Sequence, residues 1–497
     1  MQDHQQLNVL MKFGSEPILS AVPSQMRAID SRIRTFGILN SDSQDHTYDH
    51  VITTSIDSML AAHTEYLSEN LYVRPEIYAA VSHVEGRVLR IYDRVVLEDQ
   101  TKLKHPSHPT PRFRGTTDDR SQLFLRQVAY WDWVLLRHKI NAVIWQNYAH
   151  VGWDCALEAV ARANRIPYLF FHEVRPFLNS QYIFDSVEAI GDLSLGEHLI
   201  TAAKAHGWYV EDTAGRGDAM CRQISILSEN TPSQSLGLPD GFFMFRRRIG
   251  RLLTSPKQFH RSLRRRWSNY RSMKDERNSL SCGNLPVKYL FCELQSQPNA
   301  TTAIKGWMFP DQRESLAMIA SELPDDWRLV VKESDRQWSR MMPRRKNYWS
   351  QIAALERVYV VSSNADSRSL MRGSRGLLET SYSTLALEAV LNRVPVLILG
   401  KTHIAGLPGV LQINSTSEAR DAVSRIILGK TEKLDEKQLG DEIQKFVGAH
   451  RAATLEGALS STPHFESDDE LRRYQSRLES NVAGIAVAWL HKVSLSL

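Results

Sequence analysis

Residues 376–401 alternate between strand-forming and helix-forming segments, and this pattern limits how the chain can fold more than any other feature. A short apolar run at 376–379 precedes four small polar residues, and good helix formers occupy 384–392. A β-branched apolar run at 394–399 follows and is closed by Gly400. Apolar runs on both sides of a helix are typical of a βαβ unit in a buried parallel sheet.

The same alternation extends through the surrounding region. Strands are expected at residues 287–292, 328–332, 358–361, 377–379 and 394–399, with helices at 312–323, 348–355, 366–371 and 384–392. Regular alternation of this kind predicts a doubly wound parallel sheet.

The first half of the chain carries a second set of such units. Strands are expected at residues 7–13, 34–39, 51–54, 142–145 and 167–171, and helices at 120–139 and 153–164. After residue 417 the pattern is helical, at 417–428, 436–449 and 468–491. At 497 residues the chain is too long for one core. We therefore expect an α/β fold in which two Rossmann-like doubly wound domains face a cleft.

Four segments are predicted from these patterns. They are an N-terminal Rossmann-like domain at 1–245, a basic helical connector at 246–284, a C-terminal Rossmann-like domain at 285–430, and C-terminal helices at 431–497 that pack back toward the first domain. Hydrophobic residues make up 42% and charged residues 24%, as in folded soluble proteins. No apolar run is long enough to span a membrane, and residues 1–13 lack the pattern of a signal peptide. Four scattered cysteines fit reduced thiols. A cytoplasmic location is expected.

The charge is concentrated in one segment. Arg246 to Arg277 contains twelve Lys or Arg and two acidic residues, which gives a local charge of +10. Because the whole chain has a net charge of +5, the rest of the chain carries about −5. Phe259, Leu263, Trp267 and Tyr270 recur there at helical spacing, which predicts an amphipathic basic helix. A connector with solvated arginines is the favoured interpretation. Peripheral contact with an anionic membrane comes next, and nucleic acid is the least favoured partner.

Several common motifs are absent. The sequence has no GxGxxG, no GxxxxGK[ST], no HExxH, no CxxC and no GxSxG. Redox dinucleotides, P-loop nucleotide hydrolysis, the usual zinc sites and the commonest serine hydrolases are therefore not indicated. We expect neither a cofactor nor a metal.

Polar loops follow four strands of the second domain, at 295–302, 332–335, 362–364 and 380–383. Ser383 stands where a helix N-cap belongs, and a helix N-terminus favours an anion such as a phosphate. Lys332 supplies a cation near the same edge, and Glu388 lies one turn inside the helix, within reach of a ribose. The simpler interpretation is an ordinary βαβ unit whose serines only cap the helix.

In the first domain, His150 follows one strand, Asp154 opens the next helix, and Glu173 follows the next strand. Carboxyl ends of parallel strands are where open α/β sheets bind ligands. These three residues are therefore candidates for catalysis, although His150 and the neighbouring His172 could equally be surface loop residues.

The second domain resembles the capsule polysaccharide biosynthesis glycosyltransferases, which include the bacterial capsule Kdo transferases. The matching segments are QSQPNATT at 295–302, VKESD at 331–335, SYSTLALEA at 381–389 and VPVLILG at 394–400. In the first domain, NYAH at 147–150 and RIP at 165–167 also match. Four positions depart from the family pattern: Ser334-Asp335 replaces His-Pro, Asn299 replaces an acidic residue, and Tyr382 replaces glycine.

The resemblance implies a metal-independent glycosyltransferase with the GT-B-like fold, which moves a sugar from a nucleotide-sugar donor to a glycan or lipid-linked glycan of the cell surface. It makes residues 1–245 the acceptor-side domain and residues 285–430 the nucleotide-sugar-binding domain. The donor-binding residues expected from the loops and the resemblance are Gln297, Lys332, Glu333, Ser381, Ser383, Thr384 and Glu388. Two alternatives remain open. One is a polyol-phosphate transferase of similar fold, and the other is a catalytically silent assembly protein that binds glycan or membrane.

Overall fold

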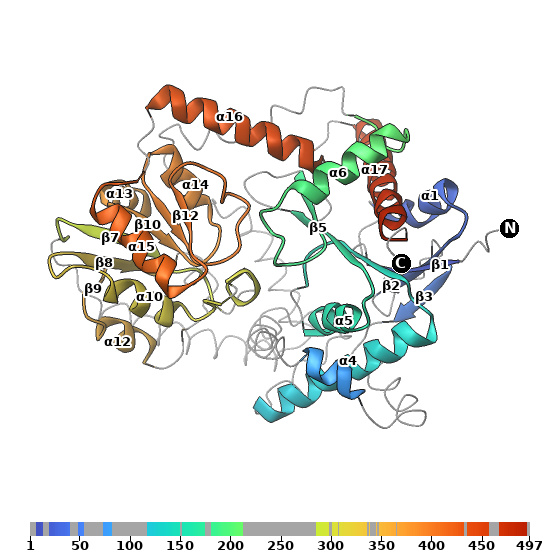
Figure 1. Ribbon diagram of the computed structural model, residues 1–497, viewed down its shortest axis with the longest axis horizontal. Helices are drawn as coiled ribbons and strands as arrows, with labels where there is room; N and C mark the ends of the chain where they lie inside the picture. The colour runs from blue at the N-terminus through green and yellow to red at the C-terminus, as the bar shows by residue number, and fades with distance from the viewer. Residues whose placement is uncertain are drawn as a thin grey trace, which may run out of the picture. The chain divides into compact units, whose positions relative to one another are not determined.

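The structure is a computed structural model that describes residues 6–12, 19–39, 48–53, 73–81, 117–149, 152–173, 180–211, 285–297, 301–306, 308–334, 337, 344, 347–363, 365–431, 435–456 and 467–494 (Figure 1). The chain divides into two compact units. One contains residues 1–96, 104–221 and 443–497, and the other contains residues 97–103 and 222–442. The basic segment from Arg246 to Arg277 lies outside the described residues.

The described part of the first unit contains a seven-stranded sheet in the order β13-β6-β5-β4-β1-β2-β3. Its strands are β1 (Leu7–Lys12), β2 (Ile33–Leu39), β3 (His50–Thr53), β4 (Ala142–Trp145), β5 (Tyr168–Glu173), β6 (Ser180–Phe184) and β13 (Thr454–Glu456). β1 to β5 are parallel, while β6 is antiparallel to both β5 and β13. The five parallel strands have the doubly wound order 3-2-1-4-5.

Helices cover both faces of this sheet. α1 (Val22–Ile29), α6 (Ser194–Ala205) and the C-terminal helix α17 (Asp468–Ser494) share a buried apolar core with one face, which presents Val9, Met11, Ile144 and Phe171. α4 (Thr117–Arg137) and α5 (Gly152–Ala163) pack together beside the other face, where Trp153 of α5 contacts Trp145 of β4.

The described part of the second unit contains a six-stranded, entirely parallel sheet in the order β12-β11-β10-β7-β8-β9. Its strands are β7 (Tyr289–Glu293), β8 (Arg328–Lys332), β9 (Val358–Val360), β10 (Leu377–Glu379), β11 (Val396–Ile398) and β12 (Val410–Gln412). Counted along the chain, this is the order 3-2-1-4-5-6 of the Rossmann fold.

The second sheet is also covered on both faces. α10 (Gln312–Ser321), α12 (Tyr348–Ala353) and α15 (Thr416–Ile427) share one buried core with it. α13 (Ser367–Gly373) and α14 (Thr384–Leu391) pack on the other face, against β7, β10 and β11. A short π-helix, η3 (Thr301–Lys305), follows β7, and α16 (Glu436–Ala453) contains the division between the two units.

The expected fold class is confirmed, since both units contain Rossmann-like doubly wound sheets and the C-terminal part of the chain is mainly helical. The strand pattern did not reveal β6, β12 or β13. The last two are three-residue strands, too short to show a periodicity, and β13 pairs with β6 across more than 260 residues of chain. Among the described residues, no helix is long and apolar enough to cross a membrane.

Candidate functional site

The carboxyl ends of three central strands in the second unit place three charged residues in a row. β10, β7 and β8 are neighbours in the sheet, and their last residues are Glu379, Glu293 and Lys332. The register puts all three side chains on the face that α13 and α14 cover. The strand order reverses between β7 and β10, and open α/β sheets bind their ligands at this point, beyond the strand ends.

Glu379 is the centre of a buried polar network at this point. It is 1% exposed, and it accepts hydrogen bonds from Ser383 Oγ at 2.7 Å and from Gln295 Nε2 at 3.1 Å. Burial, helped by the nearby Glu293 carboxylate, raises the pKa of Glu379 to about 8 against the lowering effect of the two hydrogen bonds. At neutral pH this carboxyl is therefore mainly protonated.

Gln295 joins the loop after β7 to the loop after β10. Its Nε2 also donates to the Ser381 carbonyl at 2.7 Å, and Ser381 Oγ donates back to Gln295 Oε1 at 3.1 Å. Ser381 is fully buried, so its hydroxyl is used within the protein. These bonds fix the path of the chain into α14.

Ser383 caps α14, as its place in the sequence predicts. It has an extended backbone, and its Oγ accepts the Ala386 N–H at 3.1 Å. Thr384, the first residue of the helix, is exposed. The N–H groups of the first turn of α14 therefore lie beside the β7/β10 switch point, and they favour a negatively charged group.

Lys332 and Glu293 are paired across β8 and β7, with 3.4 Å between Lys332 Nζ and Glu293 Oε1. The lysine side chain is 1% exposed and the glutamate side chain is 20% exposed. A second buried lysine, Lys305, ends η3, and desolvation lowers its pKa to about 7. Its carbonyl lies so close to Gly400 that a Cβ there would meet it at 2.2 Å, which explains the glycine after β11.

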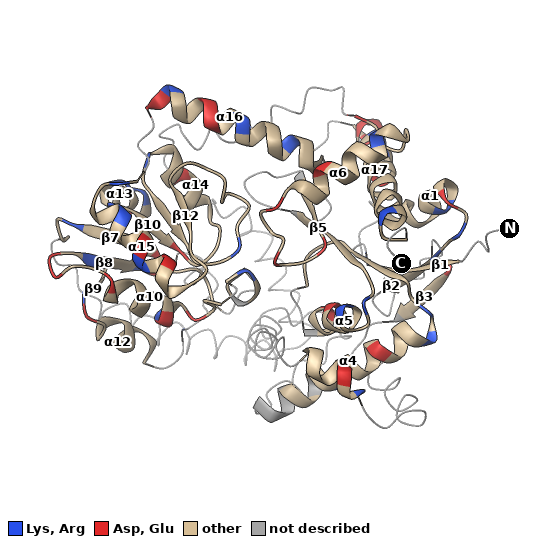
Figure 2. Ribbon diagram, in the orientation of Figure 1, with Lys and Arg blue, Asp and Glu red and all other residues tan. Residues whose placement is uncertain are grey.

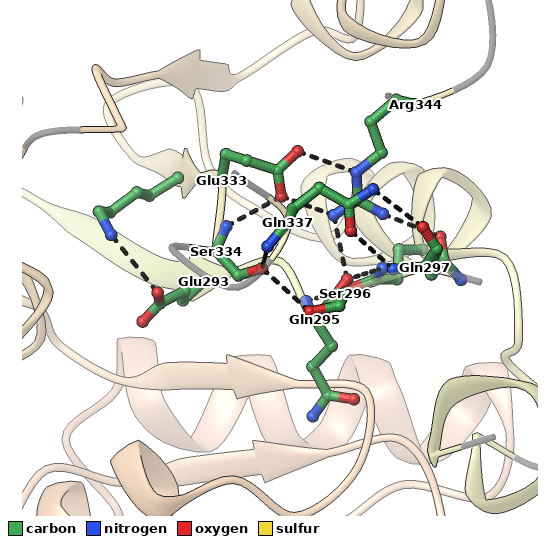
Figure 3. A network of polar contacts seen from close by, with 10 residues as sticks. Glu293, Gln295, Ser296, Gln297, Glu333, Ser334, Gln337 and Arg344 are labelled. Atoms are coloured by element: carbon green, nitrogen blue, oxygen red, sulfur yellow. Dashed lines mark hydrogen bonds and ion pairs between the residues drawn. The ribbon is translucent and has the colours of Figure 1, made fainter. Parts of the chain in front are cut away.

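Glu333 and Arg344 form a buried ion pair, in which Arg344 Nε and Nη2 donate to the two carboxylate oxygens at 2.9 and 2.6 Å (Figure 3). Arg344 Nη2 also donates to the Gln295 carbonyl at 3.0 Å, and Nη1 to Gln297 Oε1 at 3.3 Å. The guanidinium group thus connects the end of β8 to the loop after β7. Both oxygens of Glu333 are used in this structural contact.

Two glutamine side chains hold the backbone of the same loop. Gln312 accepts from the Gln295 N–H and donates to the Gln295 carbonyl, at 2.7 and 2.9 Å. Gln337 makes the same pair of bonds to Gln297, both at 2.9 Å (Figure 3). Each amide takes the place of a strand partner. These bonds hold the backbone at residues 295–297 in place.

Glu388 of α14 is 7% exposed and binds Arg368 of α13 through two hydrogen bonds, at 2.6 and 3.0 Å. The structure thus gives this carboxylate a partner on the preceding helix, α13. It is not a solvated helix residue.

The first unit gathers a different group at its own switch point, between β1 and β4. Lys12 ends β1 and is the register partner of Trp145, which ends β4. The Lys12 ammonium lies 3.7 Å from the ring centroid of Trp153 in α5. Desolvation lowers the pKa of Lys12 to about 8, while the Asp154 carboxylate raises it. Asp154, in the first turn of α5, is 1% exposed. α5 carries both acidic and basic residues (Figure 2).

Next to this group, Asn147 and His172 contact each other. Asn147 follows β4 and His172 lies in β5, and the distance from His172 Nδ1 to Asn147 Oδ1 is 3.0 Å. The Tyr148 ring meets the His172 ring edge-on at 4.8 Å. His172 is 3% exposed, so it is not a surface loop residue.

Several predicted site residues are placed by the structure. Ser381, Ser383, Thr384 and Lys332 lie at one sheet edge, Gln297 and Glu333 belong to the supporting network, and Asp154 lies at the edge of the first sheet. His150 lies outside the described residues, and Glu173 is described only as a strand residue.

The sequence interpretation missed Glu379, Gln295 and Arg344 as site residues. One signal for Glu379 was available in the sequence: it is an acidic residue that directly follows an apolar strand segment. Arg344 stands in a polar stretch where nothing local distinguishes it. Among the described residues, no group of three or more His, Cys, Asp or Glu side chains is arranged to hold a metal ion.

No protein-family model matches the chain, and no curated protein matches it. Among solved structures, UDP-GlcNAc 2-epimerase from Methanocaldococcus jannaschii in complex with UDP-GlcNAc and UDP is 12% identical, with 89% of this chain and 100% of that chain covered and a TM-score of 0.25. HepE from Anabaena in complex with UDP is 10% identical, with 99% and 100% covered and a TM-score of 0.25. The calicheamicin glycosyltransferase CalG4 is 12% identical, with 96% and 99% covered and a TM-score of 0.22. TM-scores this low support no conclusion about fold or function.

Proposed function

We propose that this chain is a glycosyltransferase that moves a sugar from a nucleotide-sugar donor to a glycan or lipid-linked glycan of the cell surface. The observation that supports the proposal most is the buried network of Glu379, Gln295, Ser381 and Ser383. It holds the N-terminus of α14 at the switch point of a Rossmann-order sheet, beside Lys332. The resemblance of these loops to the capsule polysaccharide glycosyltransferases supplies the reaction and the acceptor class.

In this proposal, the donor's phosphates bind at the first turn of α14. Ser383, Thr384 and the helix N–H groups donate hydrogen bonds to them, with Lys332 contributing positive charge. The charge that develops on the leaving nucleotide is stabilised by the helix dipole and the ammonium group, and this mechanism does not require a metal. Glu388 binds the ribose. Gln297, Glu333 and Ser381 keep the loops in position and do not contact the donor.

The first unit would bind the acceptor and supply the general base that removes its proton. His150, Asp154 and Glu173 are the candidates from the sequence. Of these, Asp154 is the one whose side chain is described, and it is buried beside Lys12. A base must reach the acceptor hydroxyl at hydrogen-bond distance, so its identity decides the acceptor geometry.

Calorimetric titration of the full chain with CMP, CDP, UDP and GDP tests the donor site. We expect saturable binding of at least one of the four, and the preferred base identifies the donor class. No saturable binding of any of them would contradict the proposal and favour the silent assembly protein. A CDP-specific site that turns over CDP-glycerol would instead indicate polyol-phosphate transfer.

The sequence of Arg246 to Arg277 also favours binding of the enzyme to an anionic membrane surface. Twelve basic residues among interspersed aromatic residues favour anionic lipid, with an affinity that falls as salt rises. Co-sedimentation with phosphatidylcholine vesicles, with and without phosphatidylserine, tests this. Equal binding to both, or binding to neither, would contradict it.

A further inference from the structure

Three basic side chains of the first unit gather around one phenylalanine, at the place where the end of α4 lies beside β3 (Figure 1). Arg34 and Phe36 belong to β2, His50 opens β3 opposite Phe36, and His138 directly follows α4. The Phe36 ring lies 5.4 Å from the His50 ring and 5.3 Å from the His138 ring, and the two imidazole rings are 4.8 Å apart. The Arg34 guanidinium lies 5.4 Å from the Phe36 ring centroid. We call Arg34, His50 and His138 the Arg34 cluster.

The Arg34 cluster has no acidic partner among the residues that the structure describes. The nearest acid along the chain is Asp49, which accepts from the Thr35 N–H and hydroxyl at 2.7 and 2.9 Å and pairs with Arg27 of α1 at 3.0 Å. Successive side chains of a strand point to opposite faces, so Thr35 lies on the other face of the sheet from its neighbours on β2. The Asp49 carboxylate is therefore used on that other face.

The electrostatic surroundings of His138 are entirely positive. Desolvation lowers the pKa of His138, and the nearby His50, Arg137 and Arg34 lower it further. None of these influences comes from a carboxylate. Like charges disfavour the protonated imidazole, and a bound anion would reverse this effect. Arg34 and His50 are exposed and His138 is only partly buried, so a ligand can reach the cluster from solvent.

We propose that Arg34, His50 and His138 form a binding site for a phosphate group. The donors come from three separate elements, and a phosphate offers several acceptor oxygens and a charge of roughly −1.5 to −2. That charge matches the two permanent charges of Arg34 and Arg137. A metal cation does not fit, because Arg34 would repel it and, within the described part of the chain, no group of three or more His, Cys, Asp or Glu is arranged to hold one.

This phosphate site is separate from the ligand-binding edge of the sheet. Leu39 ends β2 five positions after Arg34, so the arginine lies on the order of 16 Å before the carboxyl end of its strand. The site uses residues of the first unit alone. It therefore does not depend on the proposed sugar transfer, and its failure would leave that proposal unchanged.

Titration of the histidine-labelled full chain with inorganic phosphate tests the site through its imidazole resonances. His50→Gln and His138→Gln assign the two signals by their loss. We expect a saturable shift of both, and a higher apparent pKa of both imidazoles with phosphate than without, because an anion stabilises the imidazolium. His198, an exposed histidine on α6 of the same unit, is the internal control. A shift that does not saturate, or that equals the shift of His198, would overturn the inference.

Arg34→Met removes the charged donor and keeps a long apolar side chain against Phe36. We expect it to weaken phosphate binding at the two resonances by about 10- to 100-fold, the value of a charge-assisted contact. Because Arg34 is exposed, the variant should unfold in urea close to wild type. The matched control is Arg126→Met, which removes an exposed arginine of α4 and should bind phosphate like wild type. Unchanged affinity in Arg34→Met would contradict the proposal.

Sulfate tests the pH dependence, since phosphate itself changes charge near neutral pH and sulfate does not. The other charged groups of the surrounding elements, Arg27, Arg137, Lys139 and Asp49, keep their charges over the range in which imidazoles titrate. A protonated imidazole attracts an anion, so sulfate affinity should rise as the pH falls through this range. Sulfate binding that does not change with pH would exclude His50 and His138 from the site.

Vesicles distinguish the two sources of such a phosphate group. Co-sedimentation with phosphatidylcholine vesicles, with and without phosphatidic acid, compares wild type with Arg34→Met, and the basic segment from Arg246 to Arg277 is common to both proteins. Weaker binding of the variant to the acidic vesicles assigns the site to a lipid headgroup. Equal binding, together with the loss of inorganic phosphate binding, assigns it to a soluble phosphate compound.

Discussion

Ser383 Oγ lies 2.7 Å from Glu379 Oε1 and, in the same position, accepts the backbone N–H of Ala386. A hydroxyl group has one proton, so its direction depends on the protonation state of the carboxyl. In the structure Ser383 donates to Glu379. A protonated Glu379 can instead donate to Ser383, whose own proton can then point to a ligand. When Glu379 is ionised, Ser383 must donate to it. The cap of α14 and the buried acid are therefore coupled.

This coupling predicts that nucleotide affinity falls as the pH rises through about 8, the pKa of Glu379. We expect a loss of roughly 3- to 10-fold between pH 7 and pH 9, the value of about one hydrogen bond. Glu379→Gln stays neutral and should show a flatter profile. The nearby charged groups Glu293, Lys332 and Lys305 are common to both proteins. Equal slopes in calorimetric titrations of the two would contradict the prediction.

The same group predicts how stability depends on pH. Glu379 ionises near 4.5 in an unfolded chain and near 8 in the folded one, so between these values the folded state holds an extra proton. Stability should therefore fall as the pH rises across this window, with an upper limit of about 5 kcal/mol at ~1.4 kcal/mol per pH unit. Urea unfolding of wild type and Glu379→Gln at pH 5 and pH 8 measures it. If the difference in unfolding free energy between the two proteins is the same at pH 5 and pH 8, Glu379 is ionised when buried.

Ser383→Ala should cost about 1 kcal/mol of stability through the lost helix cap, and it should also weaken nucleotide binding. The matched control is Ser415→Ala, because Ser415 caps α15 in the same unit by accepting the Glu418 N–H at 3.2 Å. Ser383→Ala should lose at least as much stability as Ser415→Ala in urea unfolding, because it also removes the hydrogen bond to the buried Glu379. Only Ser383→Ala should lose affinity. Identical affinities would place the nucleotide elsewhere.

Glu388→Gln separates a ribose contact from a purely structural ion pair. Glu388→Gln and Arg368→Met both break the ion pair between α14 and α13. The Arg368 side chain is 26% exposed. Both should therefore be destabilised. If the carboxylate also binds the ribose, only Glu388→Gln should lose roughly 1.5–3 kcal/mol of binding, equally for every ribonucleotide. Calorimetry on folded variants decides. If neither variant loses affinity, Glu388 is not part of the donor site.

Arg344→Met should be among the most destabilising changes in the second unit, by roughly 3–5 kcal/mol, because it leaves the Glu333 carboxylate buried without its partner. Combining it with Glu333→Gln should recover part of this loss. A double-mutant cycle from urea unfolding measures the coupling. Additive effects would mean that the ion pair does not hold the loop at residues 295–297.

The local sequence determined the elements of this protein and their order along the chain. The run from Gly376 to Lys401 gives a strand, a serine cap, a helix and a second strand, since apolar periodicity and capping act over a few residues. Alternation of such units then predicts parallel sheets, because a helix between two strands returns the chain in the same direction. The polar residues after each strand follow from the same local pattern.

Only the tertiary structure decided which of these polar residues meet. Gln295 reaches Glu379 across 84 residues because β7 and β10 are neighbours in the sheet, and Arg344 reaches Glu333 through a polar stretch that has no periodicity. Asn147 and His172 likewise meet because β4 pairs with β5. Strand order places such residues together, and burial then changes their chemistry: a glutamate that sequence alone would leave ionised becomes a neutral acid, because water no longer stabilises its charge.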